Sequence, residues 1–220
     1  MSEGPTGAGA GAGARQRFFA WLMGRLAARY DAKLGDRKRE LYGELRGTVL
    51  EIGPGTGSSL AYLPTQVRWI GLEPNPAMHP PLRRTAQSLG RDIELRRGFA
   101  HDTGLPDRSV DAVLSSLVLC SVRRLDVTLA ELHRVLRPGG QLVYLEHVAA
   151  PSGTWLRRAQ GLVSPAWRGM FDNCHPDRET VEAIEAAGFE PLRLERFAGP
   201  LPVPLVRPHA LGVARRRHDA

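Results

Sequence analysis

A glycine-rich turn beside a carboxylate is the stretch of the sequence best suited to chemistry. Residues 49–52 form an apolar run interrupted by Glu51, and Gly53, Gly55 and Gly57 follow at every second position. Glycine allows positive φ angles and lets a ligand approach the backbone closely. Such a turn directly after a buried strand is typical of nucleotide-binding α/β proteins. These residues predict a turn that binds a nucleotide-like ligand.

The turn departs from the dinucleotide fingerprint in two respects. That fingerprint, G-x-G-x-x-G, has a third glycine where this chain has Ser58. Glu51 would also repel a diphosphate, so a cationic or zwitterionic ligand without phosphate fits better, and S-adenosylmethionine is such a ligand. Glu73 supports this interpretation, because an acidic residue at the end of the second strand can accept hydrogen bonds from both hydroxyls of a ribose.

His147 and the two cysteines are the other residues that could do chemistry. His147 ends the fifth predicted strand at the mouth of the site and is the best candidate for a general base, with a structural role as the alternative. Cys120 and Cys174 are too few for a disulfide framework and lack the spacing of metal ligands. We therefore predict no metal site, and Cys120, in an apolar segment, is interpreted as a buried and unreactive thiol.

The elements that must position these residues alternate between strand and helix from Gly47 onward. Short strands separated by helices indicate right-handed βαβ units and a parallel sheet. Strands are predicted at residues 48–53, 67–73, 93–100, 110–119, 141–148, 189–199 and 209–216. Helices are predicted to begin within residues 59–63 and to occupy residues 80–90, 125–140 and 177–188. The fold class is therefore α/β, a Rossmann-like, doubly wound, mostly parallel sheet of seven strands.

The N-terminal part divides into two segments before the domain at residues 47–215. Residues 1–14 are low-complexity Gly/Ala sequence of a kind that is usually disordered. Residues 15–46 predict an amphipathic helix, because large apolar side chains recur at helical spacing: Phe18, Trp21, Leu22, Leu26 and Tyr30. We expect this helix to act as a lid over a ligand cleft, with docking on a membrane surface as the alternative.

The formal net charge of +7 arises from 30 basic and 23 acidic residues spread through most of the chain. Without clustered basic and aromatic residues, the sequence predicts no nucleic-acid partner. No stretch approaches the roughly 18 apolar residues of a membrane span, so at most peripheral membrane contact is expected. The sparse cysteines favour a cytoplasmic protein. The sequence does not indicate an oligomeric state.

Four motifs in order give the chain a family resemblance: LEIGPGTG, GLEPNPAM, GFAHDTGLPDRSVDAVLSS and RVLRPGGQLVYLEH. It resembles the class I S-adenosylmethionine-dependent methyltransferases. Within them it is most similar to the animal methyltransferase-like alkyl-thiol methyltransferases and their bacterial relatives, through DRKRELYGEL, LVLCSV, LEHVAAP, SPAWRGMFDNC and LVRPHALG. The resemblance runs from Phe18 to Ala214. The animal proteins carry an apolar N-terminal anchor, where this chain has Gly/Ala repeats.

The resemblance implies S-adenosylmethionine as cofactor and places residues around each part of it. The methionine part would meet Glu51, near its ammonium group, and Gly53, Gly55, Gly57, Ser116 and Leu117. The ribose would be held by Glu73, flanked by Pro74, Asn75 and Met78. The adenine would meet Ala100, His101 and Asp102. Two of these have plain alternatives, because His101 could be a solvated loop residue and Asp102 could cap a helix.

On the acceptor side, the resemblance implies His147 and Asp172 as catalytic residues. It places around the acceptor pocket Cys120, Trp155, Asn173, Cys174, Arg207 and His209. The expected function is methyl transfer to a small, largely apolar acceptor, with a thiol favoured by the resemblance and by the apolar stretch after the fourth strand. A thiol is partly ionised at neutral pH and does not require a strong base. Methylation of oxygen, nitrogen or carbon in a quinol, phenol, lipid or natural product stays open. So do a nucleotide-dependent oxidoreductase and a non-catalytic nucleotide-binding protein.

Overall fold

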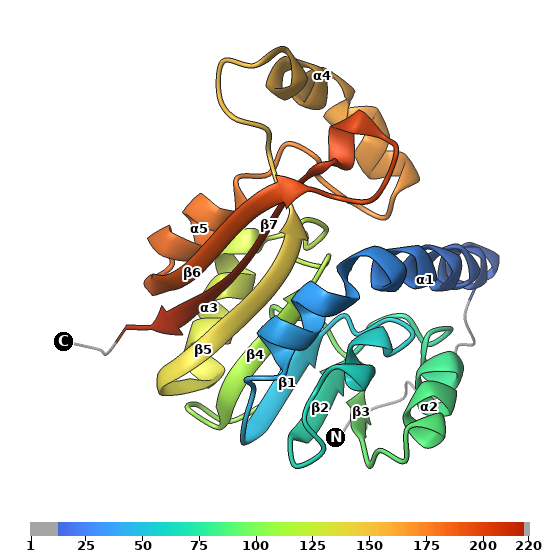
Figure 1. Ribbon diagram of the computed structural model, residues 1–220, viewed down its shortest axis with the longest axis vertical. Coiled ribbons are helices and arrows are strands. Elements are labelled where there is room, and N and C mark those ends of the chain that lie inside the picture. Colours follow the sequence, from blue (N-terminus) through green and yellow to red (C-terminus); the bar gives the residue numbers. More distant parts are fainter. Residues whose placement is uncertain (1–12, 218–220) are drawn as a thin grey trace, which may run out of the picture.

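The computed structural model describes residues 13–217, and over most of residues 15–29 it describes the path of the backbone only. Nearly all of the segment predicted to be disordered, residues 1–14, lies outside the described residues. Within the described range the chain forms a seven-stranded sheet with helices on both faces (Figure 1). The predicted α/β fold is confirmed.

The sheet has the strand order β3-β2-β1-β4-β5-β7-β6. Strands β1 to β5 run parallel to one another, and β7 is antiparallel to both β5 and β6. The order reverses between β1 and β4, which makes their carboxyl ends the expected place for a ligand. The strands are β1 Thr48–Ile52, β2 Arg68–Leu72, β3 Glu94–Arg96, β4 Val110–Ser116, β5 Leu136–His147, β6 Phe189–Ala198 and β7 Pro208–Arg216.

Two apolar cores lie on opposite faces of the sheet. One face buries Leu129 and Leu132 of α3 with Val181 and Ile184 of α5. The other buries residues of α1, the turn at Ser58–Ala61 and α2. The helices are α1 Ala14–Tyr42, α2 His79–Ser88, α3 Leu125–Val135, α4 Trp155–Met170 and α5 Thr180–Ala186, with 3₁₀ turns at Ser58–Ala61 and Pro204–Val206. The sheet is therefore covered on both faces, as parallel strands require.

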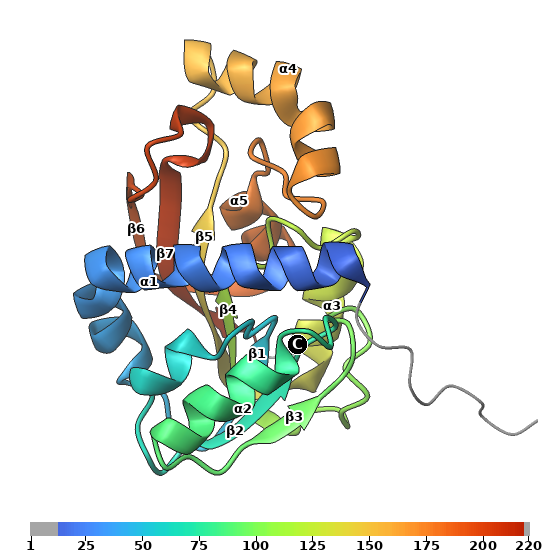
Figure 2. The same cartoon turned by 90° about the vertical axis from the view of Figure 1, so that its right-hand side faces the viewer.

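Helix α1 runs across the carboxyl end of the sheet (Figure 2). Its second half buries Tyr30, Leu34, Leu41 and Tyr42, each at most 5% exposed. The role of this helix as a lid over a ligand cleft stays a prediction. The apolar side chains predicted earlier in the helix, from Phe18 to Leu26, lie outside the described side chains. No helix in the described part of the chain is long and apolar enough to cross a bilayer.

Several predicted elements are shorter in the structure, and for three of them the cause is clear. The helix expected to begin within residues 59–63 is only the 3₁₀ turn Ser58–Ala61, because Pro64 disfavours further helix before it. The third strand shrinks to Glu94–Arg96 at the sheet edge, where only β2 pairs with it. Helix α3 ends at Val135 rather than near Pro138, because Leu136 already pairs with Val110 as β5 begins.

Helix α4 was not predicted from the sequence. Its 16 residues include Gly161, Pro165 and Gly169, which discourage a helix assignment. The side chain of Thr154 caps it by accepting a hydrogen bond from the Arg157 backbone N–H at 3.2 Å. The inner face is polar: the buried Gln160 donates to the Leu205 carbonyl at 2.9 Å. Helix α4 is thus held by capping and hydrogen bonds, which an apolar pattern does not reveal.

The carboxylate of Glu131 on α3 fastens the loop that follows β3. It accepts hydrogen bonds from the backbone N–H and the hydroxyl of Thr103, at 2.9 and 2.7 Å. Arg134 donates to it at 2.7 Å. These donors, Arg134 above all, hold the pKa of the Glu131 carboxyl at about 2, against burial, which acts in the opposite direction. The loop before Thr103 contains Ala100, His101 and Asp102.

We expect Glu131→Gln to lower the free energy of unfolding by about 1 kcal/mol at pH 7, the size of a charge-assisted hydrogen bond reduced for partial exposure. Because the folded-state pKa is depressed to about 2, this contribution is complete above the ordinary carboxyl pKa and is lost as pH falls toward 2. Urea unfolding at several pH values measures it. The exposed Glu185→Gln is the control, and a difference that does not shrink in acid would contradict the assignment.

Candidate active site

The turn after β1 is shaped by glycines in left-handed conformations. Gly53 and Gly55 have φ angles of 56° and 57°. A Cβ on Gly53 would come within 2.7 Å of Val118, whereas a Cβ on Gly55 would meet nothing within 4 Å. Gly53 is therefore needed for packing against the loop after β4. Gly55 faces open space, where its bare backbone can receive a ligand.

Glu73 joins this turn to the one that follows β2. Its two carboxylate oxygens accept hydrogen bonds from the backbone N–H groups of Gly55 and Asn75, at 3.0 and 2.8 Å. The residue is 5% exposed, and burial raises the pKa of its carboxyl. Each oxygen has a further lone pair, so Glu73 can still accept from ligand hydroxyls. Its neighbours Pro74 and Asn75 are half-buried, and Met78 is buried.

Glu51 lies beneath the turn and not on its surface. It is 1% exposed, it accepts a hydrogen bond from Trp69 Nε1 at 2.8 Å, and it accepts another from the Ser59 hydroxyl. Burial raises the pKa of its carboxyl. The structure shows Glu51 fixing the 3₁₀ turn that follows Gly57, and the predicted contact with an ammonium group stays a prediction.

The predicted adenine residues lie on the loop after β3. His101 and Asp102 are exposed and Ala100 is half-buried. Phe99, which the sequence analysis did not single out, is 59% exposed and stacks on His101 with ring centroids 5.5 Å apart. The structure thus brings an exposed aromatic ring to the residues predicted to meet adenine. A large apolar residue next to Ala100 was the signal available in the sequence.

A buried carboxylate organises the loop after β4, and the sequence analysis missed it. Glu146 on β5 is completely buried. It accepts hydrogen bonds from the Ser115 hydroxyl at 2.6 Å and from the backbone N–H groups of Val118, Leu119 and Cys120, at 3.0, 3.1 and 3.4 Å. These bonds begin where β4 ends. An acidic residue within an apolar strand was the signal, because such a residue must find partners.

The two residues predicted to line the methionine side stand at this same strand end. Ser116 is the last residue of β4 and Leu117 follows it, and both are half-buried. Leu117 has a φ angle of 60° and its N–H donates to the Leu145 carbonyl at 2.8 Å. This left-handed residue turns the chain toward Cys120.

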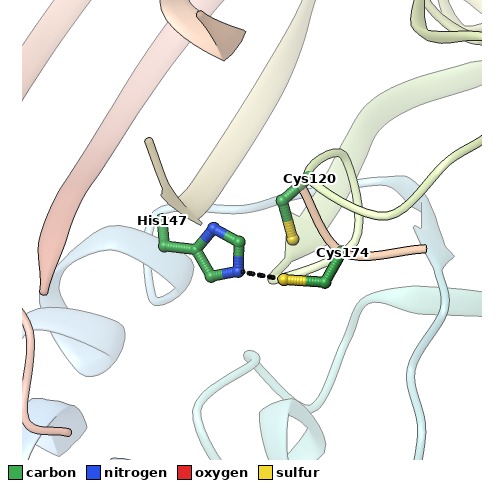
Figure 3. A group of neighbouring side chains, drawn as sticks. All are labelled: Cys120, His147 and Cys174. Carbon is green, nitrogen blue, oxygen red and sulfur yellow. Dashed lines mark hydrogen bonds between the residues drawn. The ribbon is translucent and has the colours of Figure 1, made fainter. Parts of the chain in front are cut away.

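Cys120, His147 and Cys174 meet in a buried cluster (Figure 3). Their potential ligand atoms all lie within 4.8 Å of one another. Cys174 Sγ and His147 Nε2 are hydrogen-bonded at 3.1 Å, and both cysteines are free thiols. The hydrogen bond with Cys120, followed by burial, raises the pKa of the Cys174 thiol. Sequence spacing could not reveal this cluster, because its members come from three distant segments.

His209 lies next to the cluster, with its ring centroid 6.2 Å from that of His147. Its Nδ1 donates to the Arg207 carbonyl at 2.9 Å, so its Nε2 is an acceptor, 3.3 Å from the Tyr30 hydroxyl of α1. Burial lowers the pKa of His209 to about 4. His209 is therefore neutral, and α1 contributes Tyr30 to the wall of the site.

Some of the remaining predicted residues lie close to the site, and others do not. Asn173 supports the cluster by donating from Nδ2 to the Ser121 carbonyl at 2.8 Å. Asp172 is exposed in the left-handed turn after α4, near enough to Glu73 to raise the pKa of that carboxyl slightly beside the larger effect of burial. The structure does not bring Trp155 to this group, because it is 73% exposed at the start of α4. The Arg207 carbonyl accepts the hydrogen bond from His209 Nδ1, while the residue itself is exposed.

We expect Glu146→Ala to destabilise the protein by about 3 to 5 kcal/mol, because several buried donors would lose their acceptor. The free energy of unfolding in urea is the measurement. Glu190→Ala is the matched control: it removes an exposed carboxylate paired with Arg215 and should cost at most about 1 kcal/mol. Equal losses in the two variants would contradict the role given to Glu146.

Comparisons with known proteins agree with this geometry. A family model described as a methyltransferase domain matches residues 50–144. Human thiol S-methyltransferase TMT1A is 35% identical over 212 residues, which cover 90% of this chain and 86% of that protein. Human thiol S-methyltransferase TMT1B is 36% identical over 210 residues, which cover 90% and 85%.

Solved structures share the fold at low identity. A geranyl diphosphate C-methyltransferase from Streptomyces coelicolor A3(2) has a TM-score of 0.70 at 17% identity, covering 86% of this chain and 80% of that one. A putative methyltransferase from Bacillus halodurans has a TM-score of 0.69 at 16% identity, covering 85% and 100%. The predicted resemblance is confirmed: the chain belongs to the class I S-adenosylmethionine-dependent methyltransferases, in the family of the thiol S-methyltransferases TMT1A and TMT1B.

Proposed function

We propose that this enzyme transfers a methyl group from S-adenosylmethionine to the sulfur of a small, largely apolar thiol. The observation that carries the proposal is the likeness to thiol S-methyltransferases along 90% of the chain. The chemistry of the acceptor side supports it independently, since the groups gathered there suit a nucleophile that needs little help from a base.

The cofactor side fits S-adenosylmethionine. Gly55 offers bare backbone facing open space, and Glu73 keeps acceptor capacity for ribose hydroxyls beside it. We place the adenine along the loop of Phe99, Ala100 and His101, and the methionine part between the glycine turn and Leu117. When bound, the cofactor supplies an electrophilic methyl group on a sulfonium. The residues of this chain align the acceptor with it and exclude water.

Most of the basic atoms on the acceptor side are already engaged, and Nδ1 of His147 is buried. The carboxylate of Glu146 is occupied by its donors, and Nε2 of His209 faces the Tyr30 hydroxyl. His147 Nε2 is engaged with Cys174. A hydroxyl acceptor with a pKa near 10 would need a strong base, whereas a thiol with a pKa near 8.5 is partly ionised at neutral pH. A thiol is therefore the acceptor that this set of side chains serves best.

The cofactor site is tested by Gly55→Ala, with Gly90→Ala as the matched control. Both glycines have φ near 60° and open space where a Cβ would lie, so both variants carry a similar backbone strain of about 1 to 2 kcal/mol. Only Gly55→Ala should weaken binding of S-adenosylhomocysteine, by about tenfold or more, because its methyl group enters the ligand's space. Calorimetric titration measures this. Equal affinity in the two variants would exclude the turn as the binding site.

The acceptor is tested by incubation with methyl-labelled S-adenosylmethionine and a matched panel of alkyl thiols, phenols, amines and quinols. We expect label in S-methyl products, with thiols preferred over the corresponding alcohols and phenols by at least about a hundredfold. Mass spectrometry identifies the methylated atom. If phenols, amines or quinols are methylated while thiols are not, the thiol proposal is wrong and the matching oxygen, nitrogen or carbon alternative replaces it.

A further inference from the structure

The cluster of Cys120, His147 and Cys174 contains both cysteines of the whole sequence. They come from the loop after β4, the end of β5 and the turn after α4, and all three are buried. Trp167 Nε1 donates to Cys174 Sγ at 3.1 Å. His147 Nδ1 is buried and has no hydrogen-bond partner among the described residues. Two thiols and an imidazole are thus directed at one another, without a disulfide.

The spacing of the cluster suits a tetrahedral metal ion. Zn–S distances of about 2.3 Å and Zn–N distances of about 2.0 Å separate neighbouring ligand atoms in a tetrahedral site by about 3.5 to 3.8 Å. Here Cys174 Sγ and His147 Nε2 lie 3.1 Å apart, and no two of the three ligand atoms are more than 4.8 Å apart. Sub-ångström side-chain movements would bring all three onto one ion. Thiolate and imidazole ligands favour Zn²⁺ over harder cations.

We propose that Cys120, His147 and Cys174 bind a zinc-class divalent cation whose fourth position is open to the sulfur of the acceptor. Three protein ligands with one open position are the arrangement of catalytic rather than structural zinc sites. Two thiolates and a neutral imidazole balance the double charge of the ion. The bound site is therefore neutral overall and suits a buried location.

The ligands are already held by the surrounding structure. The Cys120 N–H lies 3.4 Å from Glu146 Oε2, and the Cys120 carbonyl accepts from the His175 N–H at 2.9 Å. Arg178 donates to the Leu119 carbonyl at 2.6 Å. Such outer partners fix the orientation of metal ligands and tune their affinity. The loops would need little rearrangement to accept the ion.

The cluster also lies beside the methyl donor's turn. Val118, two residues before Cys120, packs so closely on Gly53 that a Cβ there would approach it to 2.7 Å. Tyr30 of α1 lies on the other side, where Cys120 and Cys174, after the larger effect of burial, raise the pKa of its hydroxyl. An acceptor sulfur at the open position would therefore sit between the cofactor turn and the helix that covers it.

The step that this site would support rests on the proposed thiol acceptor. On binding the ion, the acceptor loses its S–H proton to solvent and is held as a thiolate. Its sulfur then forms a bond to the methyl carbon, while the bond from that carbon to the sulfonium breaks and its electron pair stays on the cofactor's sulfur. The products are the methyl thioether and S-adenosylhomocysteine. A thioether binds the ion more weakly than a thiolate, which favours product release.

The test uses the full chain, stripped with a chelator under reducing conditions and titrated with Co²⁺ and Zn²⁺. We expect one ion per chain, thiolate-to-cobalt charge-transfer and tetrahedral d–d bands, and protection of both thiols from a disulfide reagent. Because the sequence has only two cysteines, the reagent reports on this site alone. Cys174→Ser and His147→Ala should weaken Co²⁺ binding by at least about a hundredfold. His133→Ala, which removes the imidazole that packs on Phe189 away from the cluster, should bind like the unaltered chain.

Several outcomes would overturn the inference. Two thiols that react equally fast with and without Zn²⁺, or that close to a disulfide without taking up metal, would exclude the metal site. Undiminished Co²⁺ bands in Cys174→Ser would place the ion elsewhere. Equal methylation of thiols by stripped and loaded protein would refute the acceptor role while leaving the proposed function intact. A loaded protein with the expected bands that methylates no thiol would refute the proposed function but retain the metal site.

Discussion

The buried carboxylate of Glu146 is the interaction on which the carboxyl end of the sheet depends. It ties β5 to the end of β4 and to the three residues that follow Leu117. A buried loop cannot leave its backbone N–H groups unpaired without a large cost. Glu146 satisfies three of them with one side chain, which allows the loop to be buried. Val118 then meets the glycine turn and Cys120 meets the other thiol.

The fold was predictable because its signals are local. Alternating apolar strands and helices gave the seven strands and their parallel arrangement, and the glycine turn with Glu73 lies within two adjacent strand ends. Helix α4 was not predictable, because its glycines and its proline are typical of loops. In addition, its buried side chains form hydrogen bonds with residues that are distant in the sequence. At Ser58–Ala61 the apolar pattern predicted a longer helix. Pro64 is the local signal that ends this element early, and the prediction gave it too little weight.

The acceptor side illustrates why sequence spacing fails for sites assembled by topology. Tyr30, Cys120, His147, Cys174 and His209 come from five separate segments of the chain. The number of residues between them does not predict which of them meet in space. The strand order of the sheet and the turn after α4 decide that. The resemblance named three of these residues as pocket residues and His147 as a catalytic residue, but it could not say that two thiols and an imidazole would converge. Trp155, named in the same way, lies exposed at the start of α4.

The position of β7 has a consequence for biosynthesis. It follows every other strand in the sequence, yet it lies between β5 and β6, and β6 joins the sheet only through it. While the ribosome is still translating residues before Pro208, the edge of β5 is unpaired and β6 has no partner. Unpaired edges of this kind are templates for aggregation. A nascent chain therefore exposes that edge until β7 is made, and a polypeptide released before Pro208 would be prone to aggregate and would lack His209.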